Sequence, residues 1–254
     1  MIVCKSPAEL EKMRAANQLV AQILEELAAT VAPGVSTADL DALAESKVRA
    51  AGAEPAFKGY RGYPATLCAS VNEQVVHGIP SATPLVSGDI VSLDMGVKLN
   101  GYYGDSAVTV PVGAVGEDVT SLLRVTQEAL EKGIAQVKVG GRISDIGHAI
   151  QAHVEAHGFS VVREFVGHGI GASLHEEPQI ANYGEPGRGP RLAEGMTLAI
   201  EPMVNMGKPG VKVLADGWTA VTKDGSLSAH FEHTVAVTRD GPMVLTRPRV
   251  GAGR

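Results

Sequence analysis

Cysteine is scarce in this 254-residue sequence, which contains only Cys4 and Cys68. Two cysteines provide neither a disulfide framework nor a ligand pair at zinc spacing, and this pattern is typical of a reducing compartment. No run of five or more basic residues occurs, and 28 acidic against 22 basic residues give a formal charge of −6. That charge excludes a protein whose main task is to bind nucleic-acid phosphates.

Long apolar runs are also missing. No stretch is long and apolar enough for a transmembrane helix, and the N-terminus MIVCKSPAEL lacks the apolar core and cleavage site of a signal peptide. We therefore expect a cytoplasmic chain that is neither exported nor membrane-spanning. Its 44% hydrophobic content suffices for the core of one large domain or two small ones.

Helical and strand patterns alternate along the chain. Ser6, Pro7 and Glu9 form a capping box with proline at the first helical position, and they predict a helix that ends before Pro33. Glycine endings predict three further helices, at about residues 36–52, 118–139 and 144–158. The intervening residues 66–110 and the later residues 160–246 are predicted to form strands and turns.

The order helix, helix, sheet occurs twice, with a faint internal repeat. Residues 31–52 align with 137–158 at an offset of 106. Farther along, Asp94 aligns with Glu201 and Asp105 with Glu232, at offsets of 107 and 127. Two such units, related by a pseudo-two-fold axis, would bring two carboxylates from each half to one cleft. We expect an α+β fold in which one curved sheet is backed by four helices.

These four acids lie in or at the end of apolar strand patterns. Asp94 follows Ile-Val-Ser-Leu, and Glu201 follows Leu-Ala-Ile. Pairing with lysine or arginine is the simpler explanation for any single acid of this kind. Four carboxylates gathered in apolar surroundings, however, need cations to compensate their charge.

His168 is flanked by glycines, which allow a tight turn or a close approach of the backbone. A dinucleotide-binding loop is excluded because the G-x-G-x-x-G spacing is absent. Four carboxylates and one imidazole are too many ligands for one catalytic zinc, and they match two ions that share bridging carboxylates. The imidazole favours Mn, Fe, Co or Zn over Mg or Ca, and such a pair is suited to amide hydrolysis.

Short motifs around these positions resemble the signature of type I methionine aminopeptidases, from about Ser6 to Pro248. They are Asn72–Pro80, Asp94, Gly104-Asp105, Gly167–Gly171, His175–Pro178, Ile200–Pro202 and Phe231–Thr234. The resemblance implies the pita-bread fold, with a curved antiparallel sheet and a pseudo-two-fold repeat. Residues 1–254 would form a single catalytic domain with halves at about 6–115 and 118–248. The implied reaction is removal of the initiator methionine from nascent proteins with a small second residue.

The resemblance also implies the metal ligands. Asp105 and Glu232 would bridge two divalent ions (Co, Mn, Fe or Zn), Asp94 would bind one ion, and His168 and Glu201 the other. The monovalent-cation site of relatives, which takes Na or K, matches Asn72, Gln74 and Ser228.

Catalytic and substrate-binding roles follow in the same way. His77 would contact the scissile amide, His175 would donate to the substrate carbonyl, and Glu201 would carry a proton. The methionine side chain would enter a pocket of Phe57, Tyr60, Tyr63, Cys68 and Trp218. Leu174 stands where the family often has an aromatic residue, a departure that loosens the pocket. An apolar, aromatic lining suits a flexible thioether.

Two rival functions remain open. An Xaa-Pro dipeptidase or aminopeptidase would use the same ligands but typically carries a separate N-terminal domain, for which we expect no room here. A non-catalytic pita-bread binding protein would normally have lost ligands. The type II form is disfavoured by the short gaps of 33 and 31 residues between His168, Glu201 and Glu232.

The expected partners are the N-termini of nascent polypeptides, with ribosome association as a further expectation. We expect a monomer without nucleic-acid specificity. His153 and His157 are spaced i, i+4 on a predicted helix and could in principle bind a metal, but we interpret them as a solvated pair. His148, His230 and His233 receive no role.

Overall fold

The computed structural model describes residues 1–247, so the end of the predicted second half, residue 248, lies outside the described residues. The helices within that range are α1 (Pro7–Thr30), α2 (Thr37–Ala50), α3 (Glu117–Ile134), α4 (Ile143–Ala156) and the short 3-10 helix η1 (Tyr60–Gly62). The first-half strands are β1 (Glu54–Pro55), β2 (Leu67–Val71), β3 (Gln74–Val76), β4 (Ile90–Leu99) and β5 (Tyr102–Pro111). The second-half strands are β6 (Ser160–Val161), β7 (Gly167–Gly169), β8 (Glu176–Ile180), β9 (Thr197–Ile200), β10 (Met203–Asn205), β11 (Val211–Val213), β12 (Ala220–Thr222), β13 (Ser228–His230), β14 (Glu232–Thr238) and β15 (Gly241–Val244).

The predicted capping box begins helix α1. The Ser6 hydroxyl accepts from the Glu9 N–H at 3.4 Å, and the Glu9 carboxylate accepts from the Ser6 N–H at 2.8 Å. Ser36 and Asp39 begin α2 with the same reciprocal pair. Each box satisfies backbone donors that a helix end leaves unpaired, which typically stabilises the helix by about 1 kcal/mol.

Helix α3 is shorter than predicted. The sequence suggested a helix as far as residue 139, but α3 ends at Ile134. The Val137 N–H donates to the Ile134 carbonyl, which closes a tight turn, and the Val137 side chain is fully buried. Burying the apolar side chain of Val137 in this turn is therefore more favourable than extending the helix through Val137, although the sequence pattern continues to be helical.

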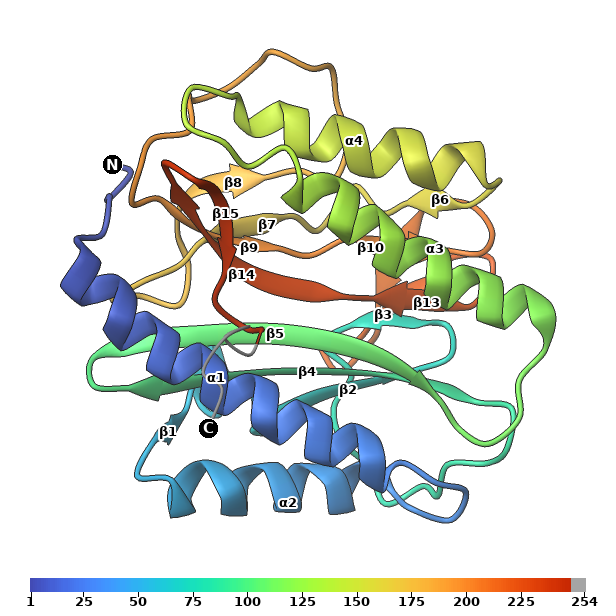
Figure 1. The fold of residues 1–254 in the computed structure, drawn as a ribbon. Helices are drawn as coiled ribbons and strands as arrows, with labels where there is room; N and C mark the ends of the chain where they lie inside the picture. Colours follow the sequence, from blue (N-terminus) through green and yellow to red (C-terminus); the bar gives the residue numbers. More distant parts are fainter. Residues whose placement is uncertain (248–254) are drawn as a thin grey trace, which may run out of the picture.

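The internal repeat has a structural counterpart. Helices α2 and α4 begin and end at the same offset, since 143 − 37 = 106 and 156 − 50 = 106. Each is the second helix of a pair followed by strands, as α1 precedes α2 and α3 precedes α4 (Figure 1).

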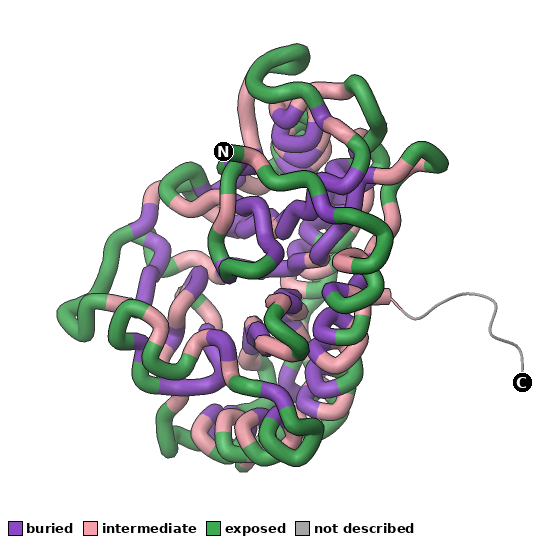
Figure 2. Tube along the Cα trace, turned by 90° about the vertical axis from the view of Figure 1, so that its left-hand side faces the viewer, coloured by how far each residue is buried: buried purple, intermediate pink, exposed green. Residues whose placement is uncertain are grey.

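Within residues 1–247 the main sheet has nine strands, in the order β1-β4-β5-β14-β9-β7-β8, with β2 on β4 and β15 on β14. Every pairing in it is antiparallel. One apolar core joins α1 and α2 to the first-half strands, and a second joins α3 and α4 to the second-half strands. Figure 2 shows the buried residues gathered on the inner sides of the helices. The predicted α+β arrangement of four helices against a curved antiparallel sheet is confirmed.

The close packing of α1 on β5 positions one of the acids. A Cβ atom at Gly104 would lie 2.7 Å from the backbone of Ala16 and Asn17, so only glycine allows the helix to approach this strand. The Asn17 side-chain carbonyl, fully buried, accepts from the N–H of the next residue, Asp105, at 3.3 Å. No helix in the described part of the chain is long and apolar enough to cross a membrane.

Candidate metal centre

Strand register places the five predicted metal ligands on one face of the main sheet. Ala107 of β5 lies opposite Asp94 on one side and opposite Glu232 on the other, and Asp105 is two residues away on the same strand. Side chains two residues apart share a face, so the three acids project together.

The same argument continues across β9 and β7. His168 lies opposite Ala199, which is two residues before Glu201. The register of β14 with β9 pairs His233 with Ile200, so the next step along it brings Glu232 opposite Glu201. The small side chains of Ala107 and Ala199 leave the space between the larger ligands open.

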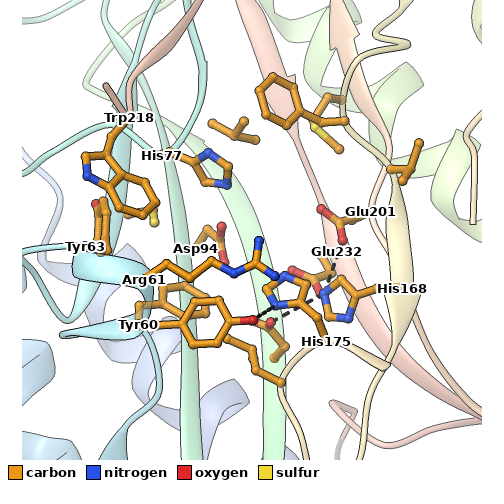
Figure 3. Close-up of a pocket in the computed structure, with 18 residues that line it drawn as sticks. Tyr60, Arg61, Tyr63, His77, Asp94, His168, His175, Glu201, Trp218 and Glu232 are labelled. Atoms are coloured by element: carbon orange, nitrogen blue, oxygen red, sulfur yellow. Dashed lines mark hydrogen bonds and ion pairs between the residues drawn. The ribbon is translucent and has the colours of Figure 1, made fainter. Parts of the chain in front are cut away.

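Short distances join these groups around a common point (Figure 3). The Nε2 atom of His168 lies 3.5 Å from Glu201 Oε1 and 3.9 Å from Asp105 Oδ2. Ligand atoms of Asp105, His168 and Glu232 all lie within 4.8 Å of one another. The Nδ1 atom of His168 pairs with the Gly169 carbonyl at 2.9 Å, which directs Nε2 toward the acids. Such a backbone bond is the usual support of a metal-binding histidine.

The carboxylates lack the partners that buried acids normally have. Asp94 Oδ1, Asp105 Oδ1 and Glu232 Oε1 are buried without a hydrogen-bond partner among residues 1–247. Burial raises the pKa of Asp94 to about 7, and burial together with the neighbouring acids raises the pKa of Asp105, Glu201 and Glu232. Ionising all four together requires positive charge between them. The donor set of four carboxylates and one imidazole fits two transition-metal ions.

The glycines beside His168 are required by close backbone contacts. A Cβ atom at Gly167 would lie 2.3 Å from the Ala199 carbonyl oxygen, and one at Gly169 would lie 2.2 Å from that of Glu177. Any other residue would push β7 away from its neighbours and displace the imidazole. The sequence prediction of a close backbone approach is confirmed.

His77 and His175 line the same cavity as the acids and come from different segments of the chain. His77 follows β3 with φ +60°, a backbone conformation that is uncommon for a residue with a side chain, and its ring contacts Phe165 edge-on at 5.4 Å. Burial lowers the pKa of His77 to about 4. His175 precedes β8, and its Nδ1 pairs with the Tyr60 hydroxyl at 2.8 Å. Burial and the Arg61 charge lower the pKa of His175.

An ion pair holds the segment that carries His175. Lys5 Nζ lies 2.5 Å from Glu176 Oε2, and both side chains are largely buried. The other Glu176 oxygen accepts from the Ser173 N–H at 3.1 Å. The residues on either side of His175 are therefore tied to the N-terminal segment before α1.

The predicted substrate-binding residues line one cavity of about 210 Å³ together with the ligands and both histidines. Its aromatic wall includes Tyr63, whose ring meets Trp218 edge-on at 5.1 Å and whose hydroxyl donates to the Leu67 and Gly78 carbonyls. Burial raises the pKa of the Cys68 thiol, so this side chain presents an uncharged surface. Phe57, Tyr60 and Leu174 complete the wall. Figure 3 shows Trp218 and Tyr63 across the cavity from Glu201, Glu232 and His168.

Sequence reasoning missed several residues at this cavity. Arg61, between the two predicted tyrosines, places its guanidinium over the Tyr60 ring at 5.4 Å, and Phe165 lies against His77. His230 was given no role, yet its fully buried Nε2 atom is 3.8 Å from Glu201 Oε2. The sequence could have indicated this position, because His230 lies two residues before Glu232 and residues two apart on an extended chain share a face.

Replacing His230 is expected to weaken divalent-ion binding. Neither ring nitrogen of His230 has a hydrogen-bond partner in the described part of the chain, and an orphaned buried polar atom typically costs about 1–3 kcal/mol. We interpret the ring as support for the Glu201 carboxylate, so His230→Ala should reduce ion affinity by roughly 10-fold in calorimetric titration. His230→Gln, which keeps a donor there, should recover most of it. Equal affinities in the native and Ala proteins would contradict this role.

The three residues predicted to hold a monovalent cation lie around adjoining segments, but their side chains already have partners. Asn72 Oδ1 accepts from the Ile90 N–H, Gln74 Oε1 accepts from the Val71 N–H, and the Ser228 hydroxyl bonds Asn205 Oδ1 at 2.9 Å. The Asn72 carbonyl accepts from the Ser228 N–H at 3.0 Å. The monovalent-cation site therefore stays a prediction.

Comparisons of the sequence and of the structure with known proteins lead to the same family of metallopeptidases. The model of metallopeptidase family M24 matches residues 11–239. Methionine aminopeptidase 1 of Bacillus subtilis (strain 168) is 56% identical over 247 residues, which cover 97% of this chain and 100% of that protein. The crystal structure of methionine aminopeptidase from Thermotoga maritima aligns with a TM-score of 0.96 at 50% identity, covering 98% of this chain and 100% of the other. A prolidase from Pyrococcus horikoshii OT3, with a TM-score of 0.78 at 22% identity, shares the fold alone and is covered over 65% of its length.

Proposed function

The chain belongs to metallopeptidase family M24, and we propose that its central cavity removes the N-terminal methionine of new polypeptides. It is a metal-dependent aminopeptidase of the pita-bread fold. The observation that carries the proposal is the meeting of five metal-ligating side chains with an enclosed aromatic pocket in one cavity. The proposal treats residues 1–254 as one catalytic domain with halves at about 6–115 and 118–248.

The proposed ligands are Asp94, Asp105, His168, Glu201 and Glu232. Across the sheet they are ordered as Asp94 on β4, Asp105 on β5, Glu232 on β14, Glu201 directly after β9 and His168 on β7, so Asp105 and Glu232 lie between Asp94 on one side and Glu201 and His168 on the other. That central position supports the proposal that these two carboxylates bridge both ions, with Asp94 at one end and Glu201 and His168 at the other. Two divalent ions (Co, Mn, Fe or Zn) would supply the Lewis acidity that activates water and polarises the scissile carbonyl.

The remaining roles belong to side chains of the chain itself. In the proposal the Tyr60 hydroxyl donates to His175 Nδ1, which leaves the proton on Nε2 and makes it a donor to the substrate carbonyl. His77 donates to the scissile amide from another segment of the cavity wall. Both rings are neutral at pH 7 because their pKa values are lowered. Neutral donors aimed at developing charge stabilise the transition state more than the substrate. Glu201 is the proposed proton carrier.

The pocket supports methionine as the preferred first residue. Its wall is apolar and aromatic, and a long unbranched thioether adapts to such a surface. Leu174 is almost fully buried, and it packs with Tyr60 and Phe57 in one apolar cluster. The smaller leucine leaves that wall less aromatic than in many relatives.

Hydrolysis should require a free N-terminal methionine and a small second residue. We expect Met-Ala-Ser to be cleaved by the metal-loaded protein, and Met-Leu-Leu or N-acetyl-Met-Ala-Ser to be cleaved at least about 10²-fold more slowly, because a misplaced scissile bond loses its orientation. Product analysis by mass spectrometry measures all three. Comparable turnover of the acetylated peptide, or preferential cleavage of an Xaa-Pro dipeptide, would overturn the assignment.

The cellular setting follows from the substrate. Nascent polypeptides are the proposed partners, so we place the protein in the cytoplasm, acting as a monomer near ribosomes without nucleic-acid specificity. Both cysteines are free thiols, which suits that compartment. A monovalent cation (Na or K) near Asn72, Gln74 and Ser228 is kept as a proposal.

A further inference from the structure

A second group of metal-ligating side chains lies outside the catalytic cavity. Glu128 of α3 meets His153 of α4 and His157, the residue that follows the last turn of α4, and one ligand atom from each lies within 4.8 Å of the others. None of the three lines the cavity. We propose that Glu128, His153 and His157 form a separate site for one divalent transition-metal ion, with Zn²⁺ as the reference ligand. The proposal does not depend on the peptidase activity.

The two histidines lie side by side at the C-terminal end of α4, where His157 is the capping residue. They are four residues apart, a spacing that places side chains one above the other, and their ring centroids are 4.5 Å apart. The sequence alone predicts a solvated pair. The tertiary structure adds Glu128, whose Oε2 atom is 2.9 Å from His153 Nε2.

Hydrogen bonds prepare these side chains as ligands. His157 Nδ1 lies 2.8 Å from the His153 carbonyl oxygen, to which it can only donate. That bond sets the tautomer and leaves the His157 Nε2 lone pair free, the arrangement found at most metal-binding histidines. His153 directs its own Nε2 toward the carboxylate, and its side chain is only 16% exposed. An ionised carboxylate only accepts, so His153 Nε2 carries the proton in its contact with Glu128, and ion binding requires this proton to leave Nε2 while Nδ1 takes one up. The three ligand groups otherwise already lie close together.

The Glu128 carboxylate is held ionised and oriented. Its Oε1 atom accepts from Arg124 NH1 at 2.9 Å, and this bond is the main reason that the pKa of Glu128 is lowered. The other oxygen faces the histidines. Arg124 also opposes a bound cation by its charge, so we expect micromolar and not nanomolar affinity.

The donor set indicates the class of ion. Two imidazoles and one carboxylate are typical ligands of Zn²⁺ and Cu²⁺, whereas Mg²⁺ and Ca²⁺ prefer oxygen alone. Bond lengths of roughly 2.0–2.2 Å at tetrahedral angles place neighbouring ligand atoms about 3.3–3.6 Å apart. The 2.9 Å contact between His153 Nε2 and Glu128 Oε2 would therefore open slightly around an ion, while a small rotation would bring in His157. The partly exposed position leaves the remaining coordination to water. An ion there would link α3 to α4 and stabilise the pair by mass action.

The test counts ions on the full-length protein. Equilibrium dialysis against about ten micromolar free Zn²⁺, followed by metal analysis, should give one ion per chain more in the native protein than in His157→Ala or His153→Ala. His148→Ala is the matched control, because His148 is an exposed histidine on the same helix that pairs with the Gly184 carbonyl and should retain the extra ion. Turnover of Met-Ala-Ser with saturating catalytic metal should not change in His157→Ala.

Cu²⁺ provides an independent readout. Its electron paramagnetic resonance spectrum in the native protein should contain a component with two imidazole nitrogens that disappears in His157→Ala and persists in His148→Ala. His157 is exposed, so this variant should fold even if His153→Ala does not. Equal ion counts in the native and His157→Ala proteins would overturn the proposal, and so would loss of the extra ion in the His148→Ala control. Failure of the peptidase assay alone would concern only the proposed function.

Discussion

Glu232→Gln is expected to abolish tight binding of both catalytic ions, whereas His168→Ala should retain one. The loss of both ions should lower kcat/KM by about 10³-fold or more, because water activation and carbonyl polarisation depend on them. Asp105→Ala should behave like Glu232→Gln and Glu232→Ala. Calorimetric titration with Co²⁺, together with metal analysis of the dialysed proteins, measures the number of ions and their affinities.

The reason is the position of the two carboxylates in the sheet. Asp105 and Glu232 lie on neighbouring strands, between Asp94 on one side and Glu201 and His168 on the other. A carboxylate between two cations lowers their mutual repulsion as well as binding each of them. A ligand at the end of the row serves one ion, so its loss leaves the other ion at the Asp94 side.

The design needs two controls. Glu185→Gln makes the same chemical change at an exposed acid that forms an ion pair with Arg188, and it should alter neither ion count nor activity. All titrations are best repeated in a His157→Ala background, so that an ion at the α3–α4 site is not counted as catalytic. A His168→Ala protein as free of metal as Glu232→Gln would refute the bridging assignment.

His77→Ala and His175→Ala should each lower kcat by about 10²-fold or more while both ions stay bound. Each ring lies in the cavity wall and is neutral at pH 7, with the pKa of His77 lowered to about 4. Removal therefore takes away a donor to the transition state without changing the charge around the ions. Steady-state kinetics on Met-Ala-Ser and metal analysis of the same samples separate the two effects.

Tyr60→Phe refines the second prediction. The Tyr60 hydroxyl pairs with His175 Nδ1, so its loss should disturb the orientation of the ring and lower kcat less than His175→Ala does. His148→Ala, on the surface of α4, should leave kcat unchanged. If the metal content of His77→Ala or His175→Ala falls along with activity, these histidines support the ions and not the transition state.

Local features of the fold were predictable where they depend on neighbouring residues. The predicted capping box of Ser6 with Glu9 forms between residues three apart, and the structure contains it. The structure adds a second box, of Ser36 with Asp39, at the predicted start of the second helix. The end of α3 was predicted too late. Whether Val137 continues a helix or turns into the core depends on the strands that it meets, which the local pattern does not contain.

Some residues of the candidate site were predictable from the sequence and others were not. Four of the metal ligands were predictable because an acidic side chain is unusual within an apolar strand pattern: Asp94, Asp105, Glu201 and Glu232. The internal repeat also aligned them in two pairs. The cavity positions of Phe165 and Arg61 were not predictable, because neither an aromatic residue nor an arginine is unusual in its local sequence. Their places in the cavity follow from the packing of remote loops.

The amino-acid sequence by itself determined the helix caps, the alternation of strands and the chemistry of the metal-ligating side chains, because these depend on residue type and short spacing. Only the tertiary structure decided which side chains meet. Antiparallel register places Ala107 opposite Asp94 of the preceding strand and opposite Glu232, which lies 232 − 107 = 125 residues farther along the chain. Helix packing likewise brings Glu128 to His153 across 25 residues. Such meetings are decided by the burial of apolar surface over the whole molecule, which no short segment contains.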